Sequence, residues 1–257
     1  MQTTIRRFGV LAPPGNVALE QELPRLVPAG VCMHHNRLSR PGAAISADSL
    51  LAMADSIGRA AHDLAQAYPE AILYGCTSGS FLAGIGREGE VAERITQQVG
   101  IPAITTSTAV VEALRAAGAR KVFLLTPYPW DITRHEESFL AHYGIETVGS
   151  DAFECQTSEA IRALSAQDVL DRLLRHRAAI ASADAVFVSC TNLLTLEKLE
   201  EIEAAFGRPA VSSNQASLWA VLAMMGIDTG GVRAGSLFRT SPRPDGALAP
   251  SAGRRTA

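Results

Sequence analysis

The sequence predicts an α/β protein built from two similar halves, each with a four-stranded parallel sheet flanked by helices. Short apolar runs alternate with longer amphipathic stretches along the chain. Hydrophobic residues make up 47% of the 257 residues and aromatic residues only 5%, which suits aliphatic strands buried beneath helices. A third observation, a local pattern that recurs at a fixed distance along the chain, indicates that the fold is duplicated.

Eight short segments are predicted to be strands. They lie at residues 6–12, 31–38, 70–76, 102–106, 121–126, 145–149, 184–190 and 209–213. Between them, stretches such as 47–67 and 166–182 place apolar residues three and four positions apart, as amphipathic helices do. Strands that alternate with helices in this way are expected to pair in parallel.

The repeat divides the chain into two halves. Three pairs of positions at strand ends or starts share an offset of 114 residues: Cys76 with Cys190, Pro13 with Pro127, and Gly30 with Gly144. We therefore expect two pseudo-symmetric Rossmann-like halves, residues 1–112 with part of 214–239 and residues 113–226, and a cleft between them. Residues 240–257 are rich in Pro, Gly and Ala without periodicity and are predicted to be a disordered tail.

Charge and composition exclude several classes of function. The net charge of −3 offers no basic surface for nucleic acid or an anionic membrane. No run approaches the roughly 18 apolar residues that span a bilayer, and the first apolar stretch is too short for a signal peptide. A cytoplasmic location is the default expectation. The four cysteines lack metal-type spacing, which predicts no metal site. In a cytoplasmic protein they are expected to be reduced thiols.

Cys76 and Cys190 are the candidate catalytic residues. Ligands of open parallel sheets bind beyond the carboxyl ends of the strands, where both cysteines are predicted to lie. If the halves face each other, one thiol can act as a nucleophile or base and the other as an acid. A lone cysteine in an apolar strand is more often core packing, which is the expectation for Cys32 and Cys155. The duplicated Cys-Thr context favours catalysis for the other two.

Polar residues follow both candidate cysteines directly. Thr77 and Ser78 come after the first, and Thr191 and Asn192 after the second. Hydroxyl, amide and backbone N–H donors near a helix start suit a carboxylate. The same N–H groups are expected to lower the thiol pKa from about 8.5 toward about 7. Because two neighbouring thiolates repel each other, one thiolate and one thiol is the expected resting state.

The chain resembles the aspartate/glutamate racemase superfamily over residues 5–228, and within it the maleate cis–trans isomerase branch. The resemblance lies in LAPPGNVALEQEL (11–23), YGCTSGS (74–80), LLTPY (124–128) and the block from SCTNLL to ASLWA (189–220). It implies an enzyme without a metal or nucleotide cofactor, acting on a small carboxylate or dicarboxylate. A homodimer or homotetramer is implied as well.

The resemblance also implies residue roles. Cys76 would add to the alkene carbon of maleate, the resulting single bond would rotate, and loss of the thiolate would give fumarate. Cys190 would donate and accept the proton, and Asn16 and Tyr128 match carboxylate-binding positions. A further substrate-binding side chain is implied within residues 153–164, where the candidates in place of an asparagine are Gln156, Thr157 and Ser158.

Three alternatives stay open. Arylmalonate decarboxylase, a near relative, needs only the second cysteine and has glycine at the position of Cys76. Amino-acid or hydroxy-acid racemases need both cysteines, but the first loop has no acidic residue before Glu20 to hold an amino group, and no histidine follows Cys190. A non-catalytic organic-acid-binding protein would need hydrogen-bond donors and no reactive thiol.

Overall fold

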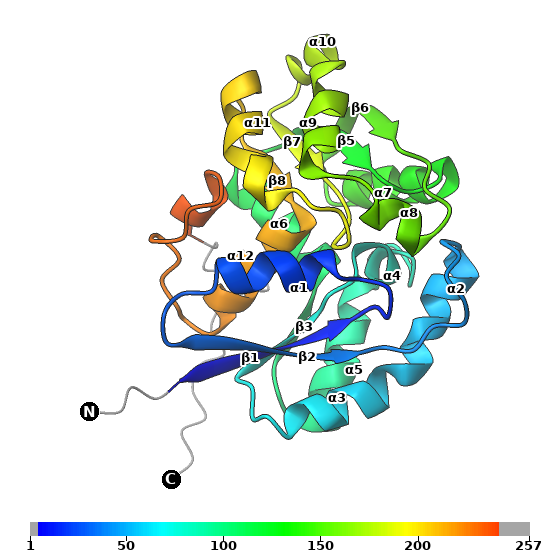
Figure 1. Cartoon of the computed structure of the whole chain (residues 1–257), viewed down its shortest axis with the longest axis vertical. Coiled ribbons are helices and arrows are strands. Elements are labelled where there is room, and N and C mark those ends of the chain that lie inside the picture. Colours follow the sequence, from blue (N-terminus) through cyan, green and yellow to red (C-terminus); the bar gives the residue numbers. More distant parts are fainter. Residues whose placement is uncertain (1–4, 242–257) are drawn as a thin grey trace.

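The computed structural model describes residues 5–241, which form two four-stranded parallel sheets flanked by helices (Figure 1). The first sheet has the strand order β2–β1–β3–β4 and the second the order β6–β5–β7–β8. Equivalent strands therefore occupy equivalent places, and the predicted fold class is confirmed. From residue 242 on, the predicted tail lies outside the described residues.

All eight predicted strands are present: β1 and β5 have the predicted ends, and the ends of the others differ by at most three residues. Strands β1 to β4 span Arg6–Ala12, Val31–Arg37, Ala71–Tyr74 and Ala103–Thr105. Strands β5 to β8 span Lys121–Thr126, Glu146–Ala152, Ala185–Val188 and Ala210–Ser212. The central strands β3 and β7 are buried along their whole length, which explains why their sequences are continuously apolar.

Helices follow the strands in both halves. Helices α1 to α6 span Ala18–Glu22, Ala47–Leu51, Ile57–Ala65, Thr77–Phe81, Glu88–Val99 and Thr106–Ala116. Helices α7 to α12 span Trp130–His142, Ser158–Arg162, Ala166–Leu174, Arg177–Ile180, Leu199–Phe206 and Ser213–Met224. Four short 3-10 helices, η1 to η4, span Leu23–Arg25, Ala52–Ser56, Leu196–Lys198 and Leu237–Arg239. Within the described residues, no helix is both long and apolar enough to cross a membrane.

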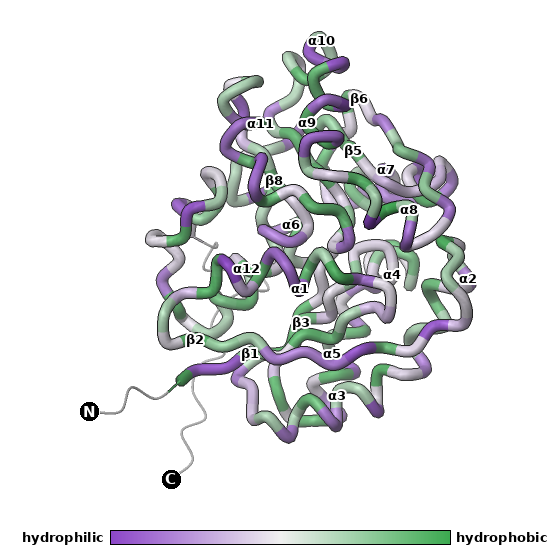
Figure 2. Tube along the Cα trace, in the orientation of Figure 1, coloured by the Kyte–Doolittle hydropathy of each residue, from purple (hydrophilic) through white to green (hydrophobic). Residues whose placement is uncertain are grey.

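The outer helices are amphipathic. In α3, the buried residues Ile57, Ala60, Ala61 and Leu64 recur at three- and four-residue spacing, as expected for a helix with one face on a sheet. Figure 2 shows the matching alternation of hydrophilic and hydrophobic segments along α3 and α11. The predicted helix 47–67 is present, but η2 divides it into α2 and α3.

Helices α6 and α12 join the two halves. They pack against each other, and each also contacts strands of both sheets (Figure 1). Helix α12 is buried on all sides from Ser213 to Leu222 and includes the fully buried Trp219. A helix that is buried all round belongs to a core. The two halves therefore share one continuous hydrophobic core, which fixes the position of one sheet relative to the other.

Candidate active site

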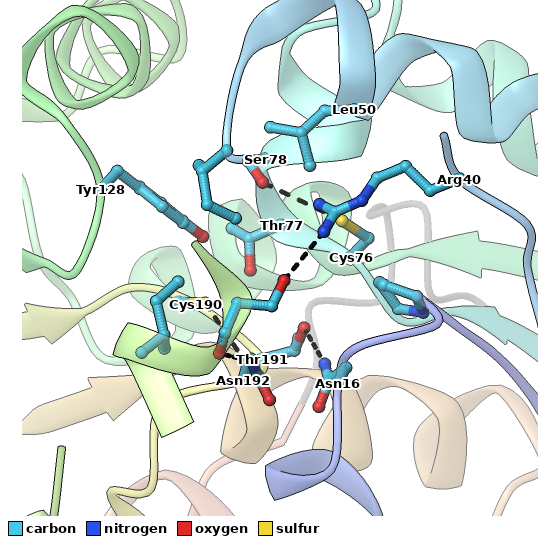
Figure 3. A pocket seen from close by; sticks show the side chains of 14 residues that line it. Asn16, Arg40, Leu50, Cys76, Thr77, Ser78, Tyr128, Cys190, Thr191 and Asn192 are labelled. Atoms are coloured by element: carbon cyan, nitrogen blue, oxygen red, sulfur yellow. Dashed lines mark hydrogen bonds between the residues drawn. The ribbon is translucent and has the colours of Figure 1, made fainter. Parts of the chain in front are cut away.

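A small cavity between the halves brings all eight predicted site residues together (Figure 3). They are Asn16, Cys76, Thr77, Ser78, Tyr128, Cys190, Thr191 and Asn192. The other lining residues are Pro13, Arg40, Ile45, Leu50, Ser158 and Ile161. The cavity volume is about 30 Å³, room for about two waters, which favours a small ligand.

Cys76 lies two residues beyond the end of β3, as the N-cap of α4. Its Sγ accepts a hydrogen bond from the backbone N–H of Gly79 at 3.3 Å, and the Ser78 hydroxyl lies 4.0 Å away. A Cβ atom at position 79 would lie only 2.9 Å from this sulfur. Glycine is therefore needed there, because only a residue without a Cβ lets the backbone approach the thiol this closely.

Cys190 lies two residues beyond the end of β7, and its backbone is unusual. Its φ angle is +97°, a value that residues other than glycine rarely adopt and that costs about 1–3 kcal/mol. The turn is held by hydrogen bonds: the Cys190 N–H donates to Ser213 Oγ at 3.0 Å, and the Asn192 N–H donates to Cys190 Sγ at 3.3 Å. This turn directs the thiol into the cavity.

The expectation of lowered thiol pKa values is wrong. The predicted N–H groups are present and do lower the pKa, but burial outweighs them, because Cys76 is only 5% exposed and Cys190 only 8%. Burial raises the pKa of Cys76 above its ordinary value and raises the pKa of Cys190 to about 12. Both residues are therefore thiols near neutral pH, rather than one thiolate and one thiol.

The two thiols nevertheless differ. The positive charge of Arg40 lowers the pKa of Cys76. At Cys190 the hydroxyl of Tyr128 acts in the same direction, but Cys76 and Glu136 raise the pKa further once they are ionised. Cys76 is therefore the residue that ionises first, and Cys190 is the one that keeps its proton.

The side chains of Asn16 and Thr191 link the two halves beside the thiols. Asn16 Nδ2 donates to Thr191 Oγ1 at 2.8 Å, and the Thr191 hydroxyl donates to the carbonyl oxygen of Gly75 at 3.0 Å. Both residues are almost fully buried. They hold the loop of the second cysteine against the end of the first sheet.

Asn192 and Thr77 make similar links. Asn192 Oδ1 accepts from the Val17 N–H at 3.0 Å, and its Nδ2 donates to the Ser158 carbonyl oxygen at 3.2 Å. The Thr77 hydroxyl donates to Ser213 Oγ at 2.9 Å. Four of the six predicted substrate-binding residues thus have side-chain hydrogen bonds that position the two cysteine loops relative to each other.

Arg40 is the charged lining residue that the sequence prediction missed. It follows β2, whose carboxyl end faces the same edge of the sheet as Cys76, and it points into the pocket (Figure 3). The general rule that ligands bind at the carboxyl ends of parallel strands could have identified it. Of the three candidates Gln156, Thr157 and Ser158, only Ser158 lines the cavity. Among the described residues, no group of three His, Cys, Asp or Glu side chains has an arrangement that could hold a metal ion.

The site is a two-cysteine site, in which each α/β half contributes one thiol from the carboxyl end of its sheet. Comparison with known proteins then identifies the family. The chain belongs to the arylmalonate decarboxylase family, whose model matches residues 8–238. Arylmalonate decarboxylase from Bordetella bronchiseptica is 32% identical over 169 residues, covering 64% of this chain and 69% of that protein.

Maleate isomerases match over more of the chain. The enzyme from Nocardia farcinica is 28% identical over 244 residues, covering 91% of this chain and 96% of the relative. A solved structure of the Nocardia farcinica maleate cis–trans isomerase, a cysteine-to-serine mutant with a covalently bound succinylcysteine intermediate, has a TM-score of 0.84 at 26% identity. It covers 91% of this chain and 98% of its own. The resemblance predicted from the sequence is confirmed.

Proposed function

We propose that the protein is a cofactor-independent cis–trans isomerase of a small dicarboxylate, of the maleate-to-fumarate type. The observation that carries the proposal is the meeting of Cys76 and Cys190 in one cavity between the halves. A succinylcysteine, as in the related Nocardia structure, is the product expected when a thiol adds across the double bond of maleate. The site supplies the two groups that such chemistry needs, a nucleophile and an acid.

The first step is addition. Cys76 loses its proton to water, and its sulfur then forms a bond to one alkene carbon. The electron pair of the double bond moves to the other alkene carbon and its carboxylate, and the Cys190 thiol protonates that carbon. The high pKa of Cys190 suits this role, because the thiol still carries its proton near neutral pH.

The second step is rotation and elimination. The former double bond is now a single bond, so the two carboxylates can turn to the trans arrangement. The Cys190 thiolate removes the proton it had donated, the C–S bond breaks, and Cys76 leaves as a thiolate. The double bond re-forms and fumarate is released. Cys190 is again a thiol, and Cys76, left as a thiolate, either starts the next cycle directly or takes a proton back from water.

The substrate carboxylates have several donors available. The hydroxyls of Ser78 and Tyr128 line the cavity, and we assign them, with Asn16, to carboxylate binding. Near the cysteines, Thr77, Thr191 and Asn192 contribute through their backbone N–H groups and by holding the loops in place. The developing charge during addition is thus surrounded by donors fixed before the reaction begins.

Decarboxylation of a substituted malonate is the second candidate, favoured by the family model and by the Bordetella relative. That reaction needs only one cysteine, to protonate the enediolate that remains after CO₂ leaves. It gives no role to Cys76, which in this chain faces the same cavity as Cys190. We therefore favour the isomerase.

Proton NMR of maleate in D₂O tests the proposal. Wild-type protein should produce fumarate, and Cys76→Ala and Cys190→Ala should each reduce the rate by at least about 10²-fold. Cys155→Ala is the matched control, since Cys155 is a buried free cysteine outside the cavity. Unchanged maleate, together with CO₂ release from a substituted malonate, would show that the protein is a decarboxylase and not an isomerase.

Three further expectations from the sequence stay proposals. The protein is a homodimer or homotetramer, which light scattering of the purified protein tests. It acts in the cytoplasm, which fluorescence microscopy of a tagged chain tests.

The boundary between the halves lies near residues 112 and 113, and part of residues 214–239 returns to the first half. The contacts of α12 with β3 and β4 support this division.

A further inference from the structure

Arg40 lies on a segment that crosses from the first half to the second. The Ile45 N–H donates to the Gln156 carbonyl oxygen at 2.9 Å, and Ala44 forms an isolated antiparallel bridge with Thr157. Because the backbone beyond Arg40 is fixed on the opposite half, its side chain is placed over the cavity. In Figure 3 it reaches past Cys76 toward the middle of the pocket.

The guanidinium of Arg40 is the only charged group among the residues that line the cavity. Its Nη2 donates to Ser158 Oγ at 2.9 Å and to the Ala43 carbonyl oxygen at 3.2 Å. Its Nε is buried and has no hydrogen-bond partner among the described residues. No carboxylate of residues 5–241 lies within ion-pair distance of it.

Arg37, three residues earlier, is an arginine whose charge and hydrogen-bond donors are paired. It forms an ion pair with Glu20 and donates to the carbonyl oxygens of Pro13, Pro14 and Asn16. Arg40 is only partly buried, but even a partly buried cation without a counter-charge loses hydration that no partner replaces. Burial accordingly lowers the pKa of Arg40. The contrast indicates that the missing partner of Arg40 is an anion that enters the cavity.

We propose that Arg40 binds one carboxylate of the substrate and makes the site selective for dicarboxylates. This inference rests on the proposed function for the identity of the substrate. The planar guanidinium matches a carboxylate in a two-point contact, and Ser158, which already accepts from Arg40, holds the guanidinium in place. The second carboxylate is left to the neutral donors Ser78, Tyr128 and Asn16. Arg40 thereby acts as a specificity-determining residue, placed beside the thiol that adds to the alkene.

Calorimetric titration with succinate tests the proposal without depending on turnover, because succinate has two carboxylates and no double bond. The Arg40→Gln variant should bind succinate about 10- to 100-fold more weakly than wild type, the range for a charge-assisted hydrogen bond. Arg40→Lys should recover part of the loss, since it restores the charge but not the two-point contact. Thermal unfolding of Arg40→Gln should occur at or above the wild-type temperature, whereas a purely structural arginine would lower it.

Arg162→Gln is the matched control. Arg162 is an exposed arginine near the same cleft, where it donates to the Gly15 carbonyl oxygen, and it does not line the cavity. Its loss should change succinate affinity by less than about threefold, because an exposed charge acts only through screened, long-range attraction. An equal loss in both arginine variants would overturn direct binding by Arg40.

The outcomes separate this inference from the proposed function. If wild type converts maleate to fumarate and Arg40→Gln binds succinate as wild type does, the role of Arg40 is wrong and the isomerase stands. If succinate binding depends on Arg40 but maleate is never converted, the role of Arg40 stands and the isomerase fails. Absence of succinate binding to wild type would overturn the role of Arg40.

Discussion

Cys76 and Cys190 occupy equivalent positions in two similar halves, yet they have different charged neighbours. Arg40 favours the thiolate of Cys76, while a thiolate at Cys76 disfavours a second thiolate at Cys190. Duplication thus explains the presence of two thiols, and the residues that differ between the halves explain why one is suited to be the nucleophile and the other the acid.

Glu136 is a buried carboxyl group just behind the second cysteine. It lies on α7, is 1% exposed, and accepts a hydrogen bond from the hydroxyl of Ser189 at 2.6 Å. Burial, with a smaller effect of the neighbouring Glu137, raises the pKa of Glu136 from 4.5 to about 8. In the folded protein the group is therefore protonated near neutral pH, whereas in the unfolded chain it is ionised.

This difference makes stability depend on pH. Between about pH 4.5 and pH 8 the folded state holds a proton that the unfolded state has lost, so the free energy of unfolding falls as pH rises, by up to about 5 kcal/mol. Glu136→Gln should have nearly wild-type stability near pH 5 and exceed it by several kcal/mol near pH 9. Urea unfolding at the two pH values measures the effect, and parallel pH profiles for the two proteins would contradict it.

The sequence predicts most residues of the site, but not Arg40 and not the pKa values of the two thiols, and the reasons are physical. The cysteines and their polar neighbours were found because they follow apolar strands and repeat. Arg40 lies in a loop with no periodic pattern, and its unpaired state depends on how the halves pack. The thiol pKa values were misjudged because sequence shows which donors follow a cysteine but not how little water reaches it.

At the scale of elements, Glu22 at the end of α1 ties the first half to η3 of the second half and to the shared helix α12. One carboxylate oxygen accepts the N–H groups of Thr195 and Leu196 beside η3, and the other accepts from Asn214 Nδ2 on α12. Glu22 is 5% exposed. Its carboxylate therefore satisfies three buried donors at once.

Replacing Glu22 with alanine should lower the free energy of unfolding by about 3 kcal/mol or more, because each buried donor left unpaired costs about 1–3 kcal/mol. Glu22→Gln should cost less, since one amide oxygen can still accept both N–H groups near η3. Chemical denaturation of both variants measures the difference. Equal stability of wild type and Glu22→Ala would show that the contact does not hold the halves together.

The strands were predictable because buried parallel strands have continuous apolar sequences. Strand β6 is the instructive exception: it runs to Ala152 rather than to residue 149. It is an edge strand, mostly half-exposed, and its register against β5 shifts between Val122 and Phe123. The residues that extend it, Ser150 and Asp151, have no apolar signal, because one side of the strand faces water.

At the scale of the whole molecule, the arrangement of the active site follows from duplication. Two sheets of equal strand order place their carboxyl ends at one shared cavity, and α6 with α12 keeps them in position through a common core. Neither half alone supplies both of the thiols that line the cavity, Cys76 and Cys190. The repeat in the sequence was sufficient to predict this arrangement, whereas the side-chain links across the cleft emerged only from the structure.

The most direct test of this account is to trap the covalent intermediate. In Cys190→Ser the base that starts elimination is missing, so maleate added to Cys76 should accumulate after protonation by water. Intact-mass and peptide mass spectrometry should show one added maleate on the peptide that contains Cys76, and none in the Cys76→Ala/Cys190→Ser double variant. If wild type forms fumarate while Cys190→Ser shows no adduct, or one on another residue, the two-thiol addition mechanism is contradicted.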